Sequence, residues 1–109
     1  MKTITDEMLG EVAGGYMSVS QWIDYLSTQV MPVLNGLMTG ASENDRTLLG
    51  TIYGTLQGTA IPGAGVVDTV TNLWTTYNTV YRPSLQSSKI QVTLDQTLYG
   101  AKQYVDSHR

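Results

Sequence analysis

Side chains that could carry out acid–base, nucleophilic or metal chemistry are few in this sequence of 109 residues. The single histidine, His108, is the penultimate residue, and there is no cysteine to act as a nucleophile or a thiolate ligand. Gly63 and Gly65 lack the lysine and the flanking strand of a phosphate-binding loop. Beyond residue 16 the acidic residues are scattered, and most suit helix caps or solvated faces: Asp24, Glu43, Asp45, Asp68, Asp95 and Asp106. We therefore expect no enzyme activity, no metal site and no cofactor.

Chemistry done to the chain, rather than by it, is indicated near the N-terminus. Gly14-Gly15 follows the stretch MKTITDEMLGEVA, in which apolar and acidic side chains are spaced to suit a short amphipathic helix. Two glycines end such a helix, and they can pass through a narrow protease cleft that admits no side chain. The stretch also lacks the long apolar segment of a Sec-type signal peptide. The residues themselves therefore predict a short amphipathic helix that stops at Gly14-Gly15.

This segment resembles the double-glycine leaders of class II bacteriocins and microcins, which peptidase-containing ABC transporters cut after the second glycine. In that family, apolar residues four, seven and twelve positions before the cut dock in a groove of the peptidase. These positions are occupied here by Val12, Leu9 and Ile4. The resemblance implies that Gly14 and Gly15 are the cleavage glycines and that the bond between Gly15 and Tyr16 is hydrolysed. One departure is visible, since the acidic residue usual eight positions before the cut is replaced by Met8, with Glu7 beside it.

The resemblance divides the chain into a leader, residues 1–15, and a mature region, residues 16–109. It implies a cytoplasmic precursor, a transporter as partner, a secreted product and an immunity protein that protects the producing cell. An ordinary amphipathic helix that stops at a glycine cap is the alternative, and the pattern alone leaves it open.

The composition of the chain is poor in charge. Charged residues make up 14% of the sequence, against about 25% in an average soluble domain. Net charge is -3, and no cluster of lysine or arginine provides the basic patch that nucleic-acid binding requires. Removal of residues 1–15 leaves five basic and six acidic residues, so the mature region is almost neutral. This suits a chain that enters a less polar medium, and equally a small threonine-rich soluble domain.

A four-residue repeat, TLLG-TIYG-TLQG, covers residues 47–58. On a helix it forms a glycine ridge at Gly50, Gly54 and Gly58 and a threonine ridge at Thr47, Thr51, Thr55 and Thr59. Each glycine costs an exposed helix about 1 kcal/mol relative to alanine, so a compensating role is expected. Small residues four apart let membrane helices approach closely, as in a glycine zipper. The alternative is a close crossing inside a soluble hairpin, against Gly36 and Gly40.

Two helices are expected to hold this repeat in the first half of the mature region. The first begins at the capping box Ser18-x-x-Gln21, and Pro32 should kink or divide it before a turn near Gly40. Its apolar stripe is Trp22, Leu26, Val30, Val33 and Leu37. The second is capped by Ser42 and ends before Pro62. Its apolar side is Leu48, Leu49, Ile52, Tyr53 and Leu56.

Two more helices are expected in the second half. Residues 66–81 have helical spacing, although their five threonines keep a strand open, and Arg82-Pro83 should end the segment. The stripe expected inside is Val66, Val70, Leu73, Tyr77 and Val80, with Val67, Trp74 and Tyr81 on a neighbouring stripe. The last helix, capped by Ser87 or Ser88, carries Ile90, Leu94, Leu98, Ala101 and Val105.

The sequence thus predicts an all-α fold, a small bundle of about four amphipathic helices arranged as hairpins and preceded by a short leader helix. It predicts the precursor of a secreted, bacteriocin-like antibacterial protein whose mature region oligomerises and acts on target-cell membranes. Two alternatives remain: a secreted self-assembling surface protein without killing activity, and a non-secreted helical binding module of the immunity type. The tryptophans and the seven tyrosines suit either a membrane interface or packing between helices.

Overall fold

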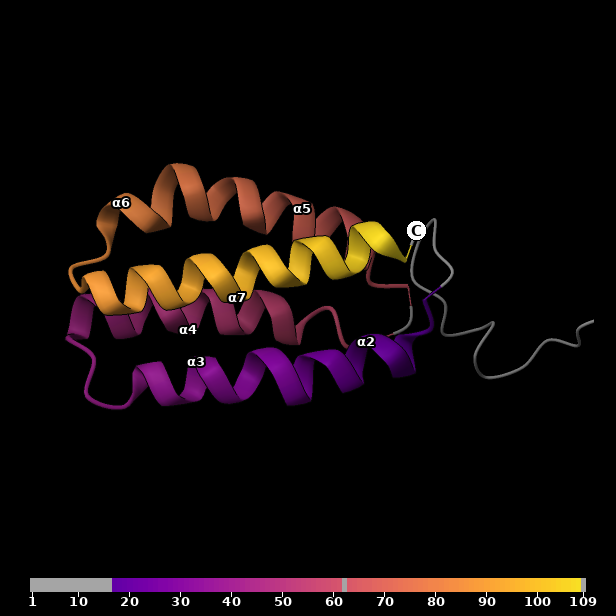
Figure 1. Cartoon of the computed structure of the whole chain (residues 1–109), viewed down its shortest axis with the longest axis horizontal. Helices are drawn as coiled ribbons and strands as arrows, with labels where there is room; N and C mark the ends of the chain where they lie inside the picture. The colour runs from indigo at the N-terminus through magenta and orange to yellow at the C-terminus, as the bar shows by residue number, and fades with distance from the viewer. Residues whose placement is uncertain (1–16, 62, 109) are drawn as a thin grey trace, which may run out of the picture.

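The computed structural model describes residues 17–61 and 63–108, and every regular element in these ranges is helical. The helical elements make up four rods. The rods lie side by side along one axis and run alternately in opposite directions (Figure 1). The predicted all-α bundle of about four helices is confirmed, and residues 66–81 are helical rather than extended. The predicted leader helix lies outside the described residues.

Each rod is built from one or more helical elements. Rod 1 comprises α2 (Val19–Tyr25), the π-helical turn η1 (Leu26–Val30) and α3 (Met31–Met38), and rod 2 is α4 (Glu43–Gln57). Rod 3 comprises α5 (Val66–Thr76), the π-helical turn η2 (Tyr77–Tyr81) and α6 (Arg82–Ser84), and rod 4 is α7 (Ser88–Ser107). Consecutive rods pack against each other, and α7 also packs against η1 and α3, so the contacts close into a ring.

Serine side chains begin three of the rods, as the sequence predicts. Ser18 and Gln21 form the capping box, with Gln21 N–H donating to Ser18 Oγ at 3.1 Å and Ser18 N–H to Gln21 Oε1 at 2.9 Å. Ser42 accepts from the Asp45 N–H at 3.2 Å, and Ser87, rather than its neighbour, caps α7. These bonds satisfy backbone donors that have no partner inside the helix.

Both π-helical turns end two residues before a proline, at Pro32 and at Pro83. Proline lacks the N–H that an α-helix needs and its ring crowds the preceding turn, so a wider turn accommodates it without breaking the rod. Side chains within the wide turns also donate to carbonyl oxygens just ahead of them. Thr28 Oγ1 donates to Asp24 O at 2.7 Å, and Asn78 Nδ2 donates to Trp74 O at 2.8 Å. The expectation that Arg82-Pro83 ends the helix is wrong, because the rod continues to Ser84.

The core runs the length of the bundle and draws apolar side chains from all four rods. Its fully or almost fully buried members include Trp22, Leu34, Leu49, Ile52, Leu56, Val70, Leu73, Tyr77, Leu94, Leu98 and Val105. Part of the predicted stripe is displaced by one residue, after the first wide turn and within the second. Leu34 is fully buried where Val33 and Leu37 were expected, and Val80 is 54% exposed while Tyr81 is half-buried. Among the described residues, no helix combines the length and apolar character needed to cross a membrane.

Candidate functional site

The residues predicted for transporter docking and cleavage lie outside the described residues. They are Ile4, Leu9, Val12, Gly14, Gly15 and Tyr16. The structure describes the chain from Met17 onward. The structure therefore bears on the second predicted site, the glycine and threonine repeat.

The repeat residues share one side of α4, which we call the glycine face and define as Thr47, Gly50, Thr51, Gly54, Thr55 and Gly58. All are exposed except Thr55, which is half-buried. Leu49, Ile52 and Leu56 occupy the opposite side of the helix and are 0% exposed. The 3.6-residue period of the helix separates the two sets, so burying the apolar residues turns the glycines outward.

No other helix in the described part of the bundle covers the glycine face closely. A methyl group added at Gly50 or Gly54 would meet nothing within 4 Å, and at Gly58 it would approach only carbonyl oxygens of its own helix. Gly36 and Gly40 have equally open surroundings. The close crossing within a hairpin, offered as an alternative role for the glycines, is therefore absent here.

The threonine hydroxyls of the glycine face are bonded to their own helix. Thr47, Thr51 and Thr55 each donate to the carbonyl oxygen four residues earlier, at 2.9, 3.1 and 3.0 Å. A hydroxyl held in this way already has an acceptor for its proton. The face therefore exposes glycine backbone and threonine methyl groups, with its hydroxyl donors already satisfied.

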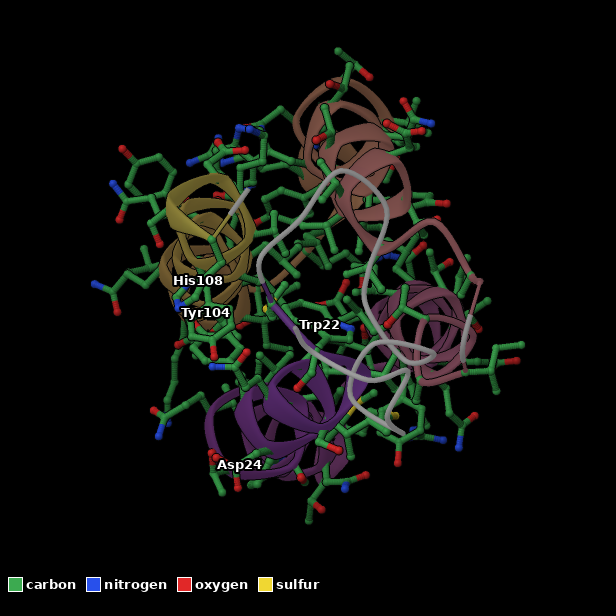
Figure 2. All side chains as sticks on the ribbon, turned by 90° about the vertical axis from the view of Figure 1, so that its right-hand side faces the viewer. Trp22, Asp24, Tyr104 and His108 are labelled. Atoms are coloured by element: carbon green, nitrogen blue, oxygen red, sulfur yellow. The ribbon has the colours of Figure 1, made fainter. Side chains whose placement is uncertain are left out.

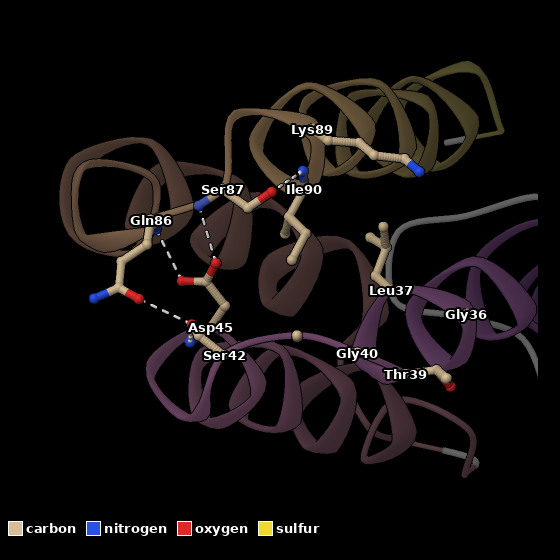
Figure 3. A pocket seen from close by; sticks show the side chains of 11 residues that line it. Gly36, Leu37, Thr39, Gly40, Ser42, Asp45, Gln86, Ser87, Lys89 and Ile90 are labelled. Carbon is tan, nitrogen blue, oxygen red and sulfur yellow. Dashed lines mark hydrogen bonds between the residues drawn. The ribbon is translucent and has the colours of Figure 1, made fainter.

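The buried carboxylate of Asp45 anchors the first turn of α4 to the segment that leads into α7. Gln86 N–H and Ser87 N–H donate to its two oxygens at 2.8 and 3.0 Å (Figure 3), and Asn44 Nδ2 donates at 3.0 Å. Burial favours a raised pKa for Asp45, but these three hydrogen bonds outweigh it and hold the pKa below its usual value. Sequence reasoning placed this residue at a helix cap and missed its burial, since Gln86 is 41 positions away.

The other end of α4 is held by a hydrogen bond from the indole of Trp22. Its Nε1 donates to Thr59 Oγ1 at 2.7 Å, and both side chains are 0% exposed. Thr59, the fourth threonine of the predicted ridge, thus turns into the core just beyond the last helical turn. The two anchors fix α4 at both ends and so fix the outward direction of its glycine face.

A third polar cluster joins rods 3 and 4 and was not predicted. Arg82 donates hydrogen bonds from Nε and Nη2 to the two oxygens of the Asp95 carboxylate, at 2.9 and 3.0 Å. The Tyr77 hydroxyl donates to the same carboxylate at 2.6 Å. The hydrogen bonds from Arg82 lower the pKa of Asp95. Burial, followed by the adjacent Asp95 carboxylate, raises the pKa of Tyr77. This arrangement stabilises the fold and offers no free nucleophile or base.

The aromatic side chains mainly pack between helices. Trp22 points into the bundle, and Tyr104 and His108 lie beside it along α7 (Figure 2). Tyr25, Tyr104 and His108 stack with successive ring centroids 4.1 and 4.2 Å apart, and Trp22 lies beside Tyr25 and Tyr104, at 5.8 and 6.2 Å from their centroids. The structure therefore supports packing between helices as the role of these four rings.

Comparison of the chain with protein-family models, with curated proteins and with solved structures found no match.

Proposed function

We propose that the chain is the precursor of a secreted antibacterial protein, cut after Gly15 by a peptidase-containing ABC transporter. The mature region, residues 16–109, then acts on the membranes of competing cells through the glycine face of α4. The transporter, the target membrane, further copies of the chain and an immunity protein are its proposed partners.

The sequence before Gly15 supports the proposed cleavage. Val12, Leu9 and Ile4 stand four, seven and twelve positions before the bond that follows Gly15, the spacing at which leaders of the resembled family dock in the peptidase.

The observation that carries the proposed activity is the exposed, uncovered glycine face. Three glycines in a helix lower its stability, and no helix within the described bundle uses the space they leave. A second helix could approach this backbone closely, and the satisfied threonine hydroxyls lower the cost of leaving water. The face is therefore suited to contact between copies of the chain in a medium of low polarity.

Membrane action requires several helices to cooperate. The 15 residues of α4 extend about 22 Å, which is shorter than the ~30 Å hydrocarbon core of a bilayer. We propose that the bundle opens at the target membrane, that apolar core residues turn toward lipid, and that α4 helices from neighbouring copies pair through Gly50, Gly54 and Gly58. Pairing would cover the remaining polar backbone.

Export is tested by producing the full chain with and without a peptidase-containing transporter. We expect a product in the culture fluid whose first residue is Tyr16, and we expect Leu9→Asp to prevent its release because a charge cannot dock in an apolar groove. A product with any other first residue, or release without the transporter, would contradict the proposed leader.

Membrane activity is tested with the mature protein by leakage of dye from anionic liposomes and by killing of indicator bacteria. Gly54→Leu should abolish both, because its side chain blocks close approach of a second helix. Gly36→Leu is the matched control, since Gly36 is another exposed helical glycine with open surroundings, and it should leave activity unchanged.

A secreted surface protein without killing activity is the second candidate, favoured by the same glycine face. In that case Gly54→Leu should abolish self-assembly of the mature chain, measured by sedimentation, while the parent protein releases no dye and kills no cells.

A further inference from the structure

A shallow groove of about 780 Å³ lies over the C-terminal half of α7, away from the glycine face. We call it the aromatic groove. Trp74 of α5 and Tyr99 of α7 line one side, Tyr25 of α2 and Tyr104 of α7 line the other, and Gly100 lies between them. A volume of this size falls in the range typical of small-molecule sites.

One side of the aromatic groove presents an accessible ring. The centroids of Trp74 and Tyr99 are 5.5 Å apart with their planes tilted by 47°, and Tyr99 is 49% exposed. Gln103 Nε2 donates to the Tyr99 hydroxyl at 3.0 Å and holds that ring in place. The pair therefore offers a positioned aromatic surface to a ligand.

The other side of the groove presents hydroxyl groups. Tyr25 and Tyr104 stack on each other with ring centroids 4.1 Å apart, and His108 stacks on Tyr104 at 4.2 Å. Trp22 lies beside this pair, with its ring centroid 5.8 Å from that of Tyr25 and 6.2 Å from that of Tyr104. The Tyr25 oxygen lies over Gly100, 3.2 Å from where a Cβ would stand, and has no hydrogen-bond partner among the residues described. A side chain at position 100 would fill this space.

The charge of the groove lining is balanced. Lys102 and Asp106, one turn apart on α7, form an ion pair with each other. The remaining lining side chains carry no formal charge: Tyr25, Trp74, Tyr99, Gly100, Gln103, Tyr104 and Ser107. An excess positive charge would be needed to attract a phosphate-rich ligand and an excess negative charge to attract a cation, so a neutral ligand is the better match.

We propose that the aromatic groove binds a neutral oligosaccharide. A pyranose ring has one face of C–H groups, which would stack on Tyr99 and Trp74, and a rim of hydroxyls, which would bond to the Tyr25 hydroxyl, to Gln103 and to the Lys102–Asp106 pair. The groove is shallow and open, so a sugar longer than one ring can reach it from solvent. This inference goes beyond the proposed membrane activity and does not depend on it, although a glycan on a cell surface would be a natural receptor.

The test is titration of the ¹⁵N-labelled full chain with chitotetraose, cellotetraose and maltotetraose up to about 10 mM, followed by NMR. We expect at least one sugar to shift the amide signals of Tyr99, Gly100 and Gln103 and the indole signal of Trp74, with saturation. Tyr99→Ala should weaken binding by about tenfold or more, whereas Tyr99→Phe keeps the ring and most of the affinity. Val92→Ala changes another exposed α7 residue outside the groove and is the matched control.

A second variant tests the groove without removing an aromatic ring. Gly100→Leu should fill the groove and abolish binding, while Gly36→Leu should not. Far-ultraviolet circular dichroism checks that both variants fold. Four outcomes would overturn the proposal: no saturable shift with any of the sugars, shifts that map elsewhere, the same shifts produced by choline alone, or shifts that follow protein concentration and reveal a second copy in the groove. Absence of killing by the parent protein, with sugar binding intact, would instead overturn only the proposed membrane activity.

Discussion

Asp45 is the residue on which the register between the two hairpins depends. Its carboxylate accepts two backbone N–H groups from the segment before α7 and one side-chain amide, while the residue is 1% exposed. A carboxylate has enough lone pairs for all three donors. An amide in its place has one acceptor oxygen and adds donors of its own, which would face other donors in a buried space.

We expect Asp45→Asn to lower the free energy of unfolding by about 2 kcal/mol, because hydrogen bonds to a charged group are lost without replacement. Asp24→Asn is the matched control on an exposed position and should change stability by less than about 0.5 kcal/mol. Urea denaturation followed by circular dichroism measures both. Equal stability of the two variants would show that Asp45 has no anchoring role.

At the scale of the elements, the glycines of α4 should reduce the stability of the folded chain. Gly50→Ala and Gly54→Ala add a methyl group where nothing lies within 4 Å, so each should raise the free energy of unfolding by about 0.5–1 kcal/mol. Gly40→Ala should have the opposite effect, since Gly40 has a φ of 80° that alanine rarely adopts. Thermal unfolding checks the signs, and a loss of stability at Gly50 or Gly54 would mean that the face is covered.

The elements also show how far the sequence predicts the fold. Apolar spacing and serine caps predicted four helices and the caps Ser18 and Ser42, and left the last cap between Ser87 and Ser88, because these signals are local. The wide turns before Pro32 and Pro83 could not be predicted from a period of 3.6 residues. Each adds a residue to the turn, which is why Leu34 replaces Val33 in the core and Val80 faces solvent.

The candidate site could be predicted only in part, for the same physical reason. The glycine face follows from a four-residue repeat, since residues four apart share one side of a helix. Whether another helix covers it depends on tertiary packing, which spacing does not reveal. The Asp95 cluster with Arg82 and the groove at Gly100 join separate parts of the chain, so no local pattern indicates them.

At the scale of the whole molecule, two carboxylates make the free energy of unfolding depend on pH. The pKa values of Asp45 and Asp95 are lower in the folded chain than the value near 4 of an unfolded chain. At pH values between the folded and the unfolded pKa, the unfolded chain therefore binds more protons than the folded chain. The stability they contribute is fully present above about pH 5 and is lost as the pH falls through the folded pKa values. We expect the urea concentration at the unfolding midpoint to decrease as the pH is lowered below about 4, and to decrease less steeply in Asp45→Asn. A slope unchanged by that substitution would contradict the assignment.

The alternating order of the four rods also bears on how quickly the chain can fold. Neighbours in sequence are neighbours in space, and the rods are joined by short segments such as Thr39–Ser42 and Leu85–Ser87. Helical bundles with such local contacts fold in microseconds to milliseconds. A chain threaded through a transporter in extended form would therefore regain its structure almost as soon as it emerges, leaving proteases little time to attack it. Stopped-flow tryptophan fluorescence after dilution from urea measures this rate, and we expect the main phase to finish within roughly milliseconds.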